Sequence, residues 1–275
     1  MSTNSGHGPD GTGPRRRDVG APPQAQMPDF FDWVRDVRRH RGLTQEQAAQ
    51  RAKISLSYLR TIENQRFSPD RTVVHCISNA YQLDDMQQRH LLELWAPAVD
   101  LAHLDALRTR LITSGELDVL DYHERTGVRA IFIDHIWDVL AANPSALHTF
   151  PGLHQGGGNV LSWYFSPAAQ EVVVEWNREA PHIVATARAV LGRHRKSPRA
   201  TQLLERLRQN PDFNQHWENT MAVAYSRPPG VLLHWREPTT GEPFSMSVQT
   251  SDHFGAADIF LSCGFPREYS GPPIS

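Results

Sequence analysis

The 275-residue chain contains little cysteine and no long apolar run. Its two cysteines, Cys76 and Cys263, lie far apart and form no C-x-x-C pair, so we expect free, buried thiols rather than a disulfide framework. No stretch of about eighteen apolar residues could form a transmembrane helix. The first residues are rich in Gly, Pro, Ser and Arg and lack the apolar centre of a signal peptide. These absences predict a cytoplasmic protein with no membrane contact.

Sequence signatures of catalysis and of metal binding are also missing. The fourteen histidines form neither an H-x-x-x-H nor an H-E-x-x-H pattern, and no Walker loop is present. The glycines at 156–158 follow His154 and are similar to the HGGG loop of esterases, but the G-x-S-x-G nucleophile motif is absent. We therefore expect no enzyme, no cofactor and no metal, and a surface loop at 154–158.

Basic charge is concentrated in one segment of a chain that is otherwise close to neutral. The formal net charge is −2, which argues against a generally basic surface. Between Arg35 and Arg66, however, eight Lys and Arg residues stand against three acidic residues. A basic segment of this kind is the expected footprint for phosphate, so any nucleic-acid contact should be local.

The same segment predicts two short helices joined by a tight turn. Thr44 with Gln47 three residues later forms a capping box, and Ser55 caps the second helix after a turn at Lys53 and Ile54. An ordinary helical bundle is the alternative, and the basic charge argues against it. Small and polar side chains on the outer face of the second helix suit base edges and phosphates. The expected DNA contacts on that face are Leu56, Ser57, Arg60 and Thr61.

Further DNA contacts are expected outside the second helix. Gln45 stands at the start of the first helix, where it can brace a phosphate or a neighbouring side chain. The candidates for contacts to the DNA backbone are Arg38, Arg41, Arg51 and Lys53.

The segment resembles the XRE (Cro/C1-like) helix-turn-helix family. The matching pieces are R-G-L-T-Q-E at 41–46, the alanine pair at 48–49, the I-S turn at 54–55 and Y-L-x-x-I-E at 58–63. The family usually has glycine in the turn, where Lys53 stands here. The resemblance implies a sequence-specific transcription regulator, a homodimer that binds a double-stranded DNA operator through the major groove.

We expect a mainly α helix-turn-helix domain of five helices, followed by an α+β PAS-like domain with a five-stranded antiparallel sheet. Strands are predicted near 128–134 and 137–142, then helices, then three strands between 231 and 264, with helices covering one side of the sheet. The predicted boundaries are a disordered tail at 1–27, the DNA-binding domain at 28–96, a linker helix at 97–113, the second domain at 114–267 and a tail at 268–275.

The second domain resembles the MmyB-like ligand-binding domain. The resemblance rests on W-D-V-L-A-A-N-P at 137–144, P-D-F-N-Q-H-W at 211–217 and several shorter pieces between them. It implies a PAS-like pocket for a small apolar ligand, which is fatty-acid-like in at least one member. The sequence departs from the family pattern at Glu237-Pro238 and after Trp217, where head-group recognition would differ.

Large aromatic residues are the candidate walls of this pocket, and a few polar residues could orient a ligand head group. The candidate ligand-binding residues are Trp137, Trp163, Trp176, Phe213, Trp217 and Trp235, with Asn143, His216 and Arg236 as the polar ones. Ordinary core packing is the alternative for each. The alternative to a ligand-binding second domain is one that serves only dimerisation or partner binding. The leucine stripe at 99–112 motivates this alternative.

Overall fold

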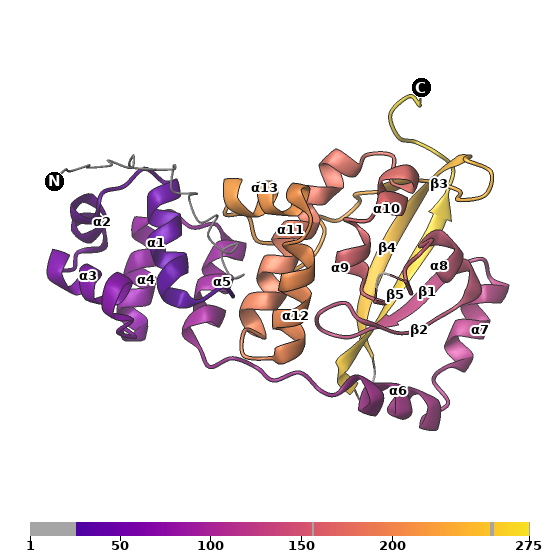
Figure 1. The fold of residues 1–275 in the computed structure, drawn as a ribbon, viewed down its shortest axis with the longest axis horizontal. Helices are drawn as coiled ribbons and strands as arrows, with labels where there is room; N and C mark the ends of the chain where they lie inside the picture. Colours follow the sequence, from indigo (N-terminus) through magenta and orange to yellow (C-terminus); the bar gives the residue numbers. More distant parts are fainter. Residues whose placement is uncertain (1–25, 156, 254–255, 275) are drawn as a thin grey trace, which may run out of the picture.

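The computed structural model describes residues 26–155, 157–253 and 256–274, and Figure 1 shows a helical region followed by a region of helices and one sheet. The helical region spans the predicted DNA-binding domain. Residues 1–25 of the predicted tail lie outside the described residues. The helices of the first region are α1 (Phe30–His40), α2 (Gln45–Ala52), α3 (Leu56–Gln65), α4 (Arg71–Ala80) and α5 (Asp85–Trp95).

Side-chain caps fix the starts of α2 and α3. The Thr44 hydroxyl accepts from the Gln47 backbone N–H at 3.1 Å, and the Gln47 side chain accepts from the Thr44 N–H at 2.9 Å. The Ser55 hydroxyl accepts from the N–H of Tyr58 at 3.1 Å. Between the two helices, Lys53 has a φ of 56°, a left-handed conformation that glycine adopts more easily. The predicted turn therefore forms, with Lys53 in a costly backbone conformation.

Small residues on α2 allow its neighbours to approach closely. Ala48, Ala49 and Ala52 are at most 3% exposed, and Leu59 and Ile62 of α3 are completely buried beneath them in the same core. Burial of these side chains, at roughly 25 cal/mol per Å² of apolar surface, holds α3 against α2. The rest of α3 is then left toward solvent.

The second region is built on five antiparallel strands in the order β2-β1-β5-β4-β3. The central strand, β5, pairs with β1 on one side and with β4 on the other. The first two and the last three strands of the region therefore meet in one sheet, which confirms the predicted five-stranded antiparallel sheet. The strands are β1 (Arg129–Ile133), β2 (Val139–Ala142), β3 (Leu233–Arg236), β4 (Pro243–His253) and β5 (Ala256–Arg267).

Helices cover both faces of this sheet, whereas we expected them on one side only. Ile131 and Ile133 point to the face that packs against the helices between β2 and β3. Ala130 and Phe132 alternate with them and pack against α6 and α7. The helices of this region are α6 (Leu104–Thr113), α7 (Asp118–Arg125), α8 (Pro144–Thr149), α9 (Val160–Trp163), α10 (Pro167–Val172), α11 (Trp176–Arg193), α12 (Pro198–Leu207) and α13 (Pro211–Asn219).

The predicted linker helix is shorter than expected and is part of the sheet region. The backbone N–H of Val99 donates to the carbonyl of Arg193 at 3.0 Å. Residues around Val99, which precede α6, therefore lie against α11 and are not helical. Helix α6 therefore begins only at Leu104. Leu107 and Leu111, at 3% and 1% exposed, pack against the sheet face opposite α11. The leucine stripe is thus buried against the chain's own sheet.

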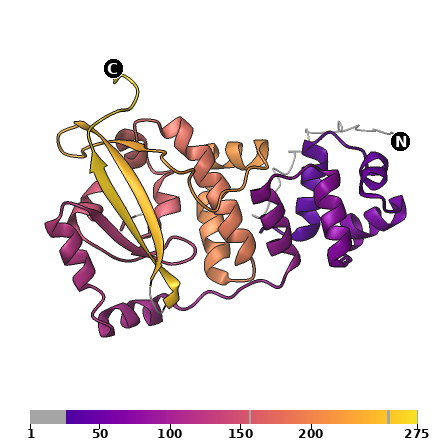
Figure 2. The same ribbon diagram turned by 180° about the vertical axis from the view of Figure 1, so that it is seen from behind.

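Helix α11 brings the two regions into direct contact, as Figure 2 also shows from behind. Ala189 is completely buried in the core of the helical region. Gly192 lies so close to α5 that a Cβ atom there would be 2.4 Å from Cε1 of His90. On α5, Glu93 accepts from the hydroxyl of Tyr225 at 2.6 Å. The domain junction is therefore packed and hydrogen-bonded.

Candidate DNA interface and ligand cavity

The outer face of α3 carries the side chains predicted to contact DNA. Ser57 and Arg60 are exposed, while Leu56 and Thr61 are half-buried. The Thr61 hydroxyl donates to the Ser57 carbonyl at 2.9 Å. The face is therefore polar near the helix start, with Arg60 as its one cation among the described residues of α3.

A chain of hydrogen bonds connects this face to the interior of the helical region. Nε of Arg60 donates to Oε1 of Gln45 at 3.4 Å, and Nε2 of Gln45 donates to Glu63 at 2.9 Å. Glu63 is 2% exposed and also accepts two bonds from Arg38, at 2.6 and 2.8 Å. Gln45 thus braces the side chain of Arg60, which is one of the two roles expected for it; the other was to brace a phosphate.

Arg38 occupies a different place from the one expected of a DNA-backbone contact. Its side chain is buried, and besides Glu63 it donates to the carbonyl of Leu43 at 2.9 Å. The hydrogen bond to Glu63 raises the pKa of this guanidinium, because a buried carboxylate favours the charged form. The sequence pattern missed this partnership, since Arg38 and Glu63 are 25 residues apart.

The remaining cations expected at the DNA backbone are exposed. Arg51 and Lys53 lie at the end of α2 and make no ion pair among the described residues. Arg41 donates to the carbonyl of Gln82 at 3.1 Å, and so lies against the turn between α4 and α5.

A cavity of about 60 Å³ lies between the sheet and the helices of the second region. Trp137 and Trp235 of the predicted set line it, with Ile183 of α11 on the helical side. Trp137 has a φ of 68°, a conformation that is costly for an aromatic residue. Trp235 is completely buried, and its Nε1 has no hydrogen-bond partner among the described residues.

Two arginines that the sequence analysis missed also line this cavity. Arg129 donates to the Thr149 hydroxyl at 2.7 Å, and no carboxylate among the described residues lies within 4 Å of it. Burial lowers the pKa of its guanidinium. Arg227 is instead paired with Glu179 at 2.5 Å. Of the two arginines, Arg129 is therefore the one with N–H donors that are free to bind a ligand.

Several predicted ligand residues have structural roles instead. Asn143 caps α8 through the N–H of Ala146 at 2.9 Å and also bonds the backbone of residues 128 and 130. Trp163 donates its Nε1 to the carbonyl of Pro151 at 2.8 Å, and Trp176 donates to that of Tyr164 at 2.7 Å. These three side chains have their polar atoms occupied, and the cavity lining does not include them.

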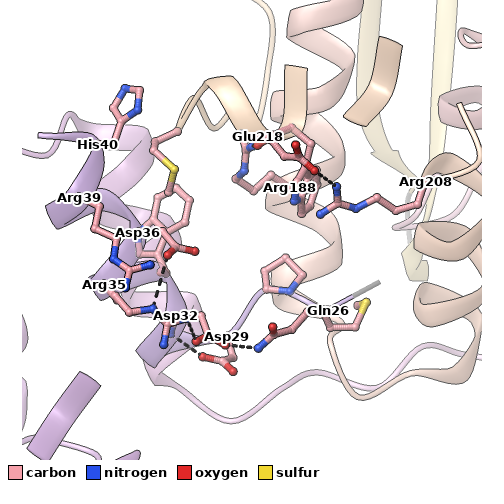
Figure 3. A pocket seen from close by; sticks show the side chains of 15 residues that line it. Gln26, Asp29, Asp32, Arg35, Asp36, Arg39, His40, Arg188, Arg208 and Glu218 are labelled. Carbon is pink, nitrogen blue, oxygen red and sulfur yellow. Dashed lines mark hydrogen bonds and ion pairs between the residues drawn. The ribbon is translucent and has the colours of Figure 1, made fainter. Parts of the chain in front are cut away.

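The other four predicted ligand residues lie elsewhere. Phe213 is completely buried and stacks on Trp217, with ring centroids 5.3 Å apart. His216 and Arg236 are partly exposed, and neither lines the cavity against the sheet. Trp217 lines a separate cavity of about 430 Å³ at the domain junction, shown in Figure 3. The predicted set is thus divided among the sheet cavity, the core and the junction.

Comparison with known protein families agrees with this architecture. Residues 33–91 match a helix-turn-helix domain family, and residues 113–264 match the MmyB-like transcription regulator ligand binding domain. No curated protein matched the chain. Among the described residues, no helix is long and apolar enough to cross a bilayer, and no group of His, Cys, Asp and Glu could hold a metal ion.

A helix-turn-helix joined to a ligand binding domain defines a DNA-binding transcription regulator. The match to the second domain covers more than half of the chain. The chain therefore belongs to the MmyB-like transcription regulators.

Proposed function

We propose that the chain binds a specific DNA operator as a homodimer, through the outer face of α3, and that a small apolar ligand in the sheet cavity changes this binding. The observation that carries the DNA part is the brace from Glu63 through Gln45 to Arg60. It holds a long cationic side chain on an exposed helix face, which reduces the entropy that Arg60 loses on binding a base.

The proposed contacts follow from exposure. Ser57, Arg60, Leu56 and Thr61 would face base edges and phosphates, and Arg51 and Lys53 would bind the DNA backbone. Arg38 is left out because its guanidinium is already bound to Glu63. Arg41 remains a proposed backbone contact, since it is exposed and its bond to the carbonyl of Gln82 uses only one of its nitrogens.

The proposed ligand is apolar, fatty-acid-like, and small or flexible. At about 60 Å³ the sheet cavity is well below the roughly 300–1,000 Å³ of ordinary ligand sites. Ligand entry must therefore move side chains that line the cavity, such as that of Trp137, whose backbone φ is 68°. Arg129 and Nε1 of Trp235 supply the polar groups that a ligand head group could meet.

Ligand binding would reach the DNA-binding region through α11. Ile183 lines the sheet cavity, and Ala189, less than two turns further along, packs in the core of the helical region. Helix α11 is a continuous element from Trp176 to Arg193, so a displacement at Ile183 would be carried to α5. By linkage, ligand and DNA affinities would then change each other reciprocally, by about 1–3 kcal/mol.

Selection of DNA from a random library with the full-length chain tests the DNA part. A palindromic consensus bound with strong salt dependence is the expected result. On that site, Arg60→Ala should weaken binding by about 1–3 kcal/mol. Arg71→Ala is the matched control, because Arg71 is exposed at the start of α4, outside the proposed contacts. Unchanged affinity of the Arg60 variant would remove Arg60 from the interface.

A second function for the sheet region is dimerisation or partner binding without a ligand. The small size of the sheet cavity favours it, whereas the burial of Leu107 and Leu111 removes the leucine stripe as its surface. Native mass spectrometry of the purified chain separates the two. A co-purified small molecule supports ligand sensing, and a dimer without added mass supports the alternative.

A further inference from the structure

The cavity at the domain junction has the size of an ordinary small-molecule site. Its volume is about 430 Å³, against roughly 300–1,000 Å³ for typical ligand pockets. One wall is the side of α1, and the other is formed by side chains from α11 to α13 and the segment after α13. Figure 3 shows the charged side chains of the two walls on opposite sides of the cavity. Any molecule bound here would touch both domains.

The wall contributed by the second domain contains a buried, unpaired positive charge. Arg188 of α11 is 3% exposed and donates to the carbonyls of Ala222 and Trp217, the latter at 2.7 Å. Among the described residues, no carboxylate lies within 4 Å of its guanidinium. Burial, and then the charge of Arg208, lowers its pKa to about 10, so it stays charged at neutral pH. A buried charge without a counter-charge is costly, and an anion would remove that cost.

Most acidic side chains around the cavity already have cationic partners. Asp29 and Asp32 both bind Arg66, and Asp32 also binds Arg35. On the other wall, Glu218 is paired with Arg208 at 3.2 Å. Within these pairs the positive and negative charges largely cancel.

The remaining charges at the cavity are mainly positive. Asp36 lies 3.6 Å from Arg35, and partial burial raises the pKa of its carboxyl. Arg39 of α1 is exposed and makes no ion pair among the described residues. Arg188 and Arg39 are therefore the two guanidinium groups in the lining without a carboxylate partner, one on each wall.

Apolar side chains complete the lining between these two charges. Met27, Pro28, Met221 and Trp217 line the cavity. A lining of this kind fits the carbon skeleton of an organic molecule better than a bare inorganic ion.

We propose that the junction cavity binds a small organic anion whose acidic groups, carboxylate or phosphate, pair with Arg188 on one wall and Arg39 on the other. This site is separate from the sheet cavity, and its occupant would bridge α1 of the DNA-binding domain and α11 of the ligand binding domain. A bridging anion adds contacts that exist only while the two domains keep this arrangement. It would therefore favour the arrangement seen here over any other.

Titration calorimetry of the full-length chain tests the proposal, with inorganic phosphate and succinate as separate probes at constant ionic strength. Arg39→Gln should weaken binding of the preferred probe about tenfold or more, because a charge-assisted hydrogen bond is lost. Arg188→Gln should abolish binding. Arg71→Gln, which removes an exposed arginine outside the cavity, should leave binding unchanged.

The outcomes separate the junction from the DNA-binding face. Because Arg188 also holds the carbonyls of Ala222 and Trp217, its variant could unfold, and the exposed Arg39 then carries the test. Equal affinities of the parent and Arg39→Gln overturn the proposal. An equal loss in Arg60→Ala overturns it as well, since the probe would then bind the face of α3. Absence of binding by both probes at about 10 mM, a weaker affinity than specific sites show, also overturns it.

Discussion

Glu63 connects the interior of the helical region to the DNA-binding face, and Glu63→Gln would test how much this connection stabilises the region. The carboxylate accepts two bonds from Arg38, at 2.6 and 2.8 Å, and one from Gln45, at 2.9 Å. An amide of the same shape can accept from only one of its two terminal atoms. The variant therefore leaves the Arg38 guanidinium, at 7% exposed, without a counter-charge. We expect the free energy of unfolding to fall by about 3 kcal/mol, within the range for broken buried ion pairs.

Urea denaturation followed by circular dichroism measures this loss, with the slope of the transition as a check that both proteins unfold alike. The control is the double variant Arg38→Met with Glu63→Leu, which replaces both charges by apolar side chains. We expect it to be more stable than Glu63→Gln, because the desolvation cost of both ions is removed together, even though the Leu43 carbonyl loses its donor and Gln45 its acceptor. A loss below about 1 kcal/mol for Glu63→Gln, or a double variant as unstable as the single one, would refute the reasoning.

Three further predictions follow from local geometry. Lys53→Gly should stabilise the chain by about 0.5–1 kcal/mol in the same urea assay, because Lys53 has a φ of 56°, which glycine adopts more easily. The variant should also bind DNA more weakly, because one contact to the DNA backbone is lost. A destabilised variant would contradict this prediction. Gly192→Ala should cost about 1–3 kcal/mol, because its Cβ would lie 2.4 Å from Cε1 of His90, and it should alter DNA affinity although it is remote from α3. Burial lowers the pKa of His90 to about 3, so below pH 6.5 the unfolded chain binds a proton that the folded chain does not. The contribution of His90 to stability should therefore fall by up to about 1.4 kcal/mol per pH unit between pH 6.5 and 4, and His90→Leu should make the thermal-melting profile less steep in that range, where burial also lowers the pKa of His182 and of His194.

The helix-turn-helix could be predicted from sequence because its determinants are local. Thr44 and Gln47 are three residues apart, and the turn at Lys53 is defined by the caps on either side of it. Apolar spacing then assigns each helix face. The role of Arg38 could not be predicted in this way, because its partner Glu63 is brought to it only by tertiary packing. An arginine on a basic helix face and an arginine in a buried ion pair have the same local sequence signature.

The ligand residues were harder to predict because the sheet joins strands that are distant in the chain. Trp235 of β3 faces the sheet cavity together with Arg129 of β1, and the pairings of β1 with β5, of β5 with β4 and of β4 with β3 set their positions. Tryptophans were chosen by residue type, and several, such as Trp163, proved to be core residues with their Nε1 already bonded. Arg236 was the arginine chosen for the ligand site, and Arg129 and Arg188 were missed. Both are recognisable only once burial and the lack of a carboxylate partner are known.

The two cavities differ in a way that bears on regulation. The sheet cavity is small and lined mostly by packed apolar side chains, so binding there requires the surrounding structure to move. The junction cavity is already large enough for a ligand, so binding there requires little movement and instead holds the domains together. Helix α11 borders both, through Ile183 at the first and Arg188 at the second. A ligand in the sheet cavity that shifts α11 must therefore also move Arg188, and the two proposed ligands would oppose each other. Measured together, each should weaken the affinity for the other by the same factor, as linkage between two sites on one element requires.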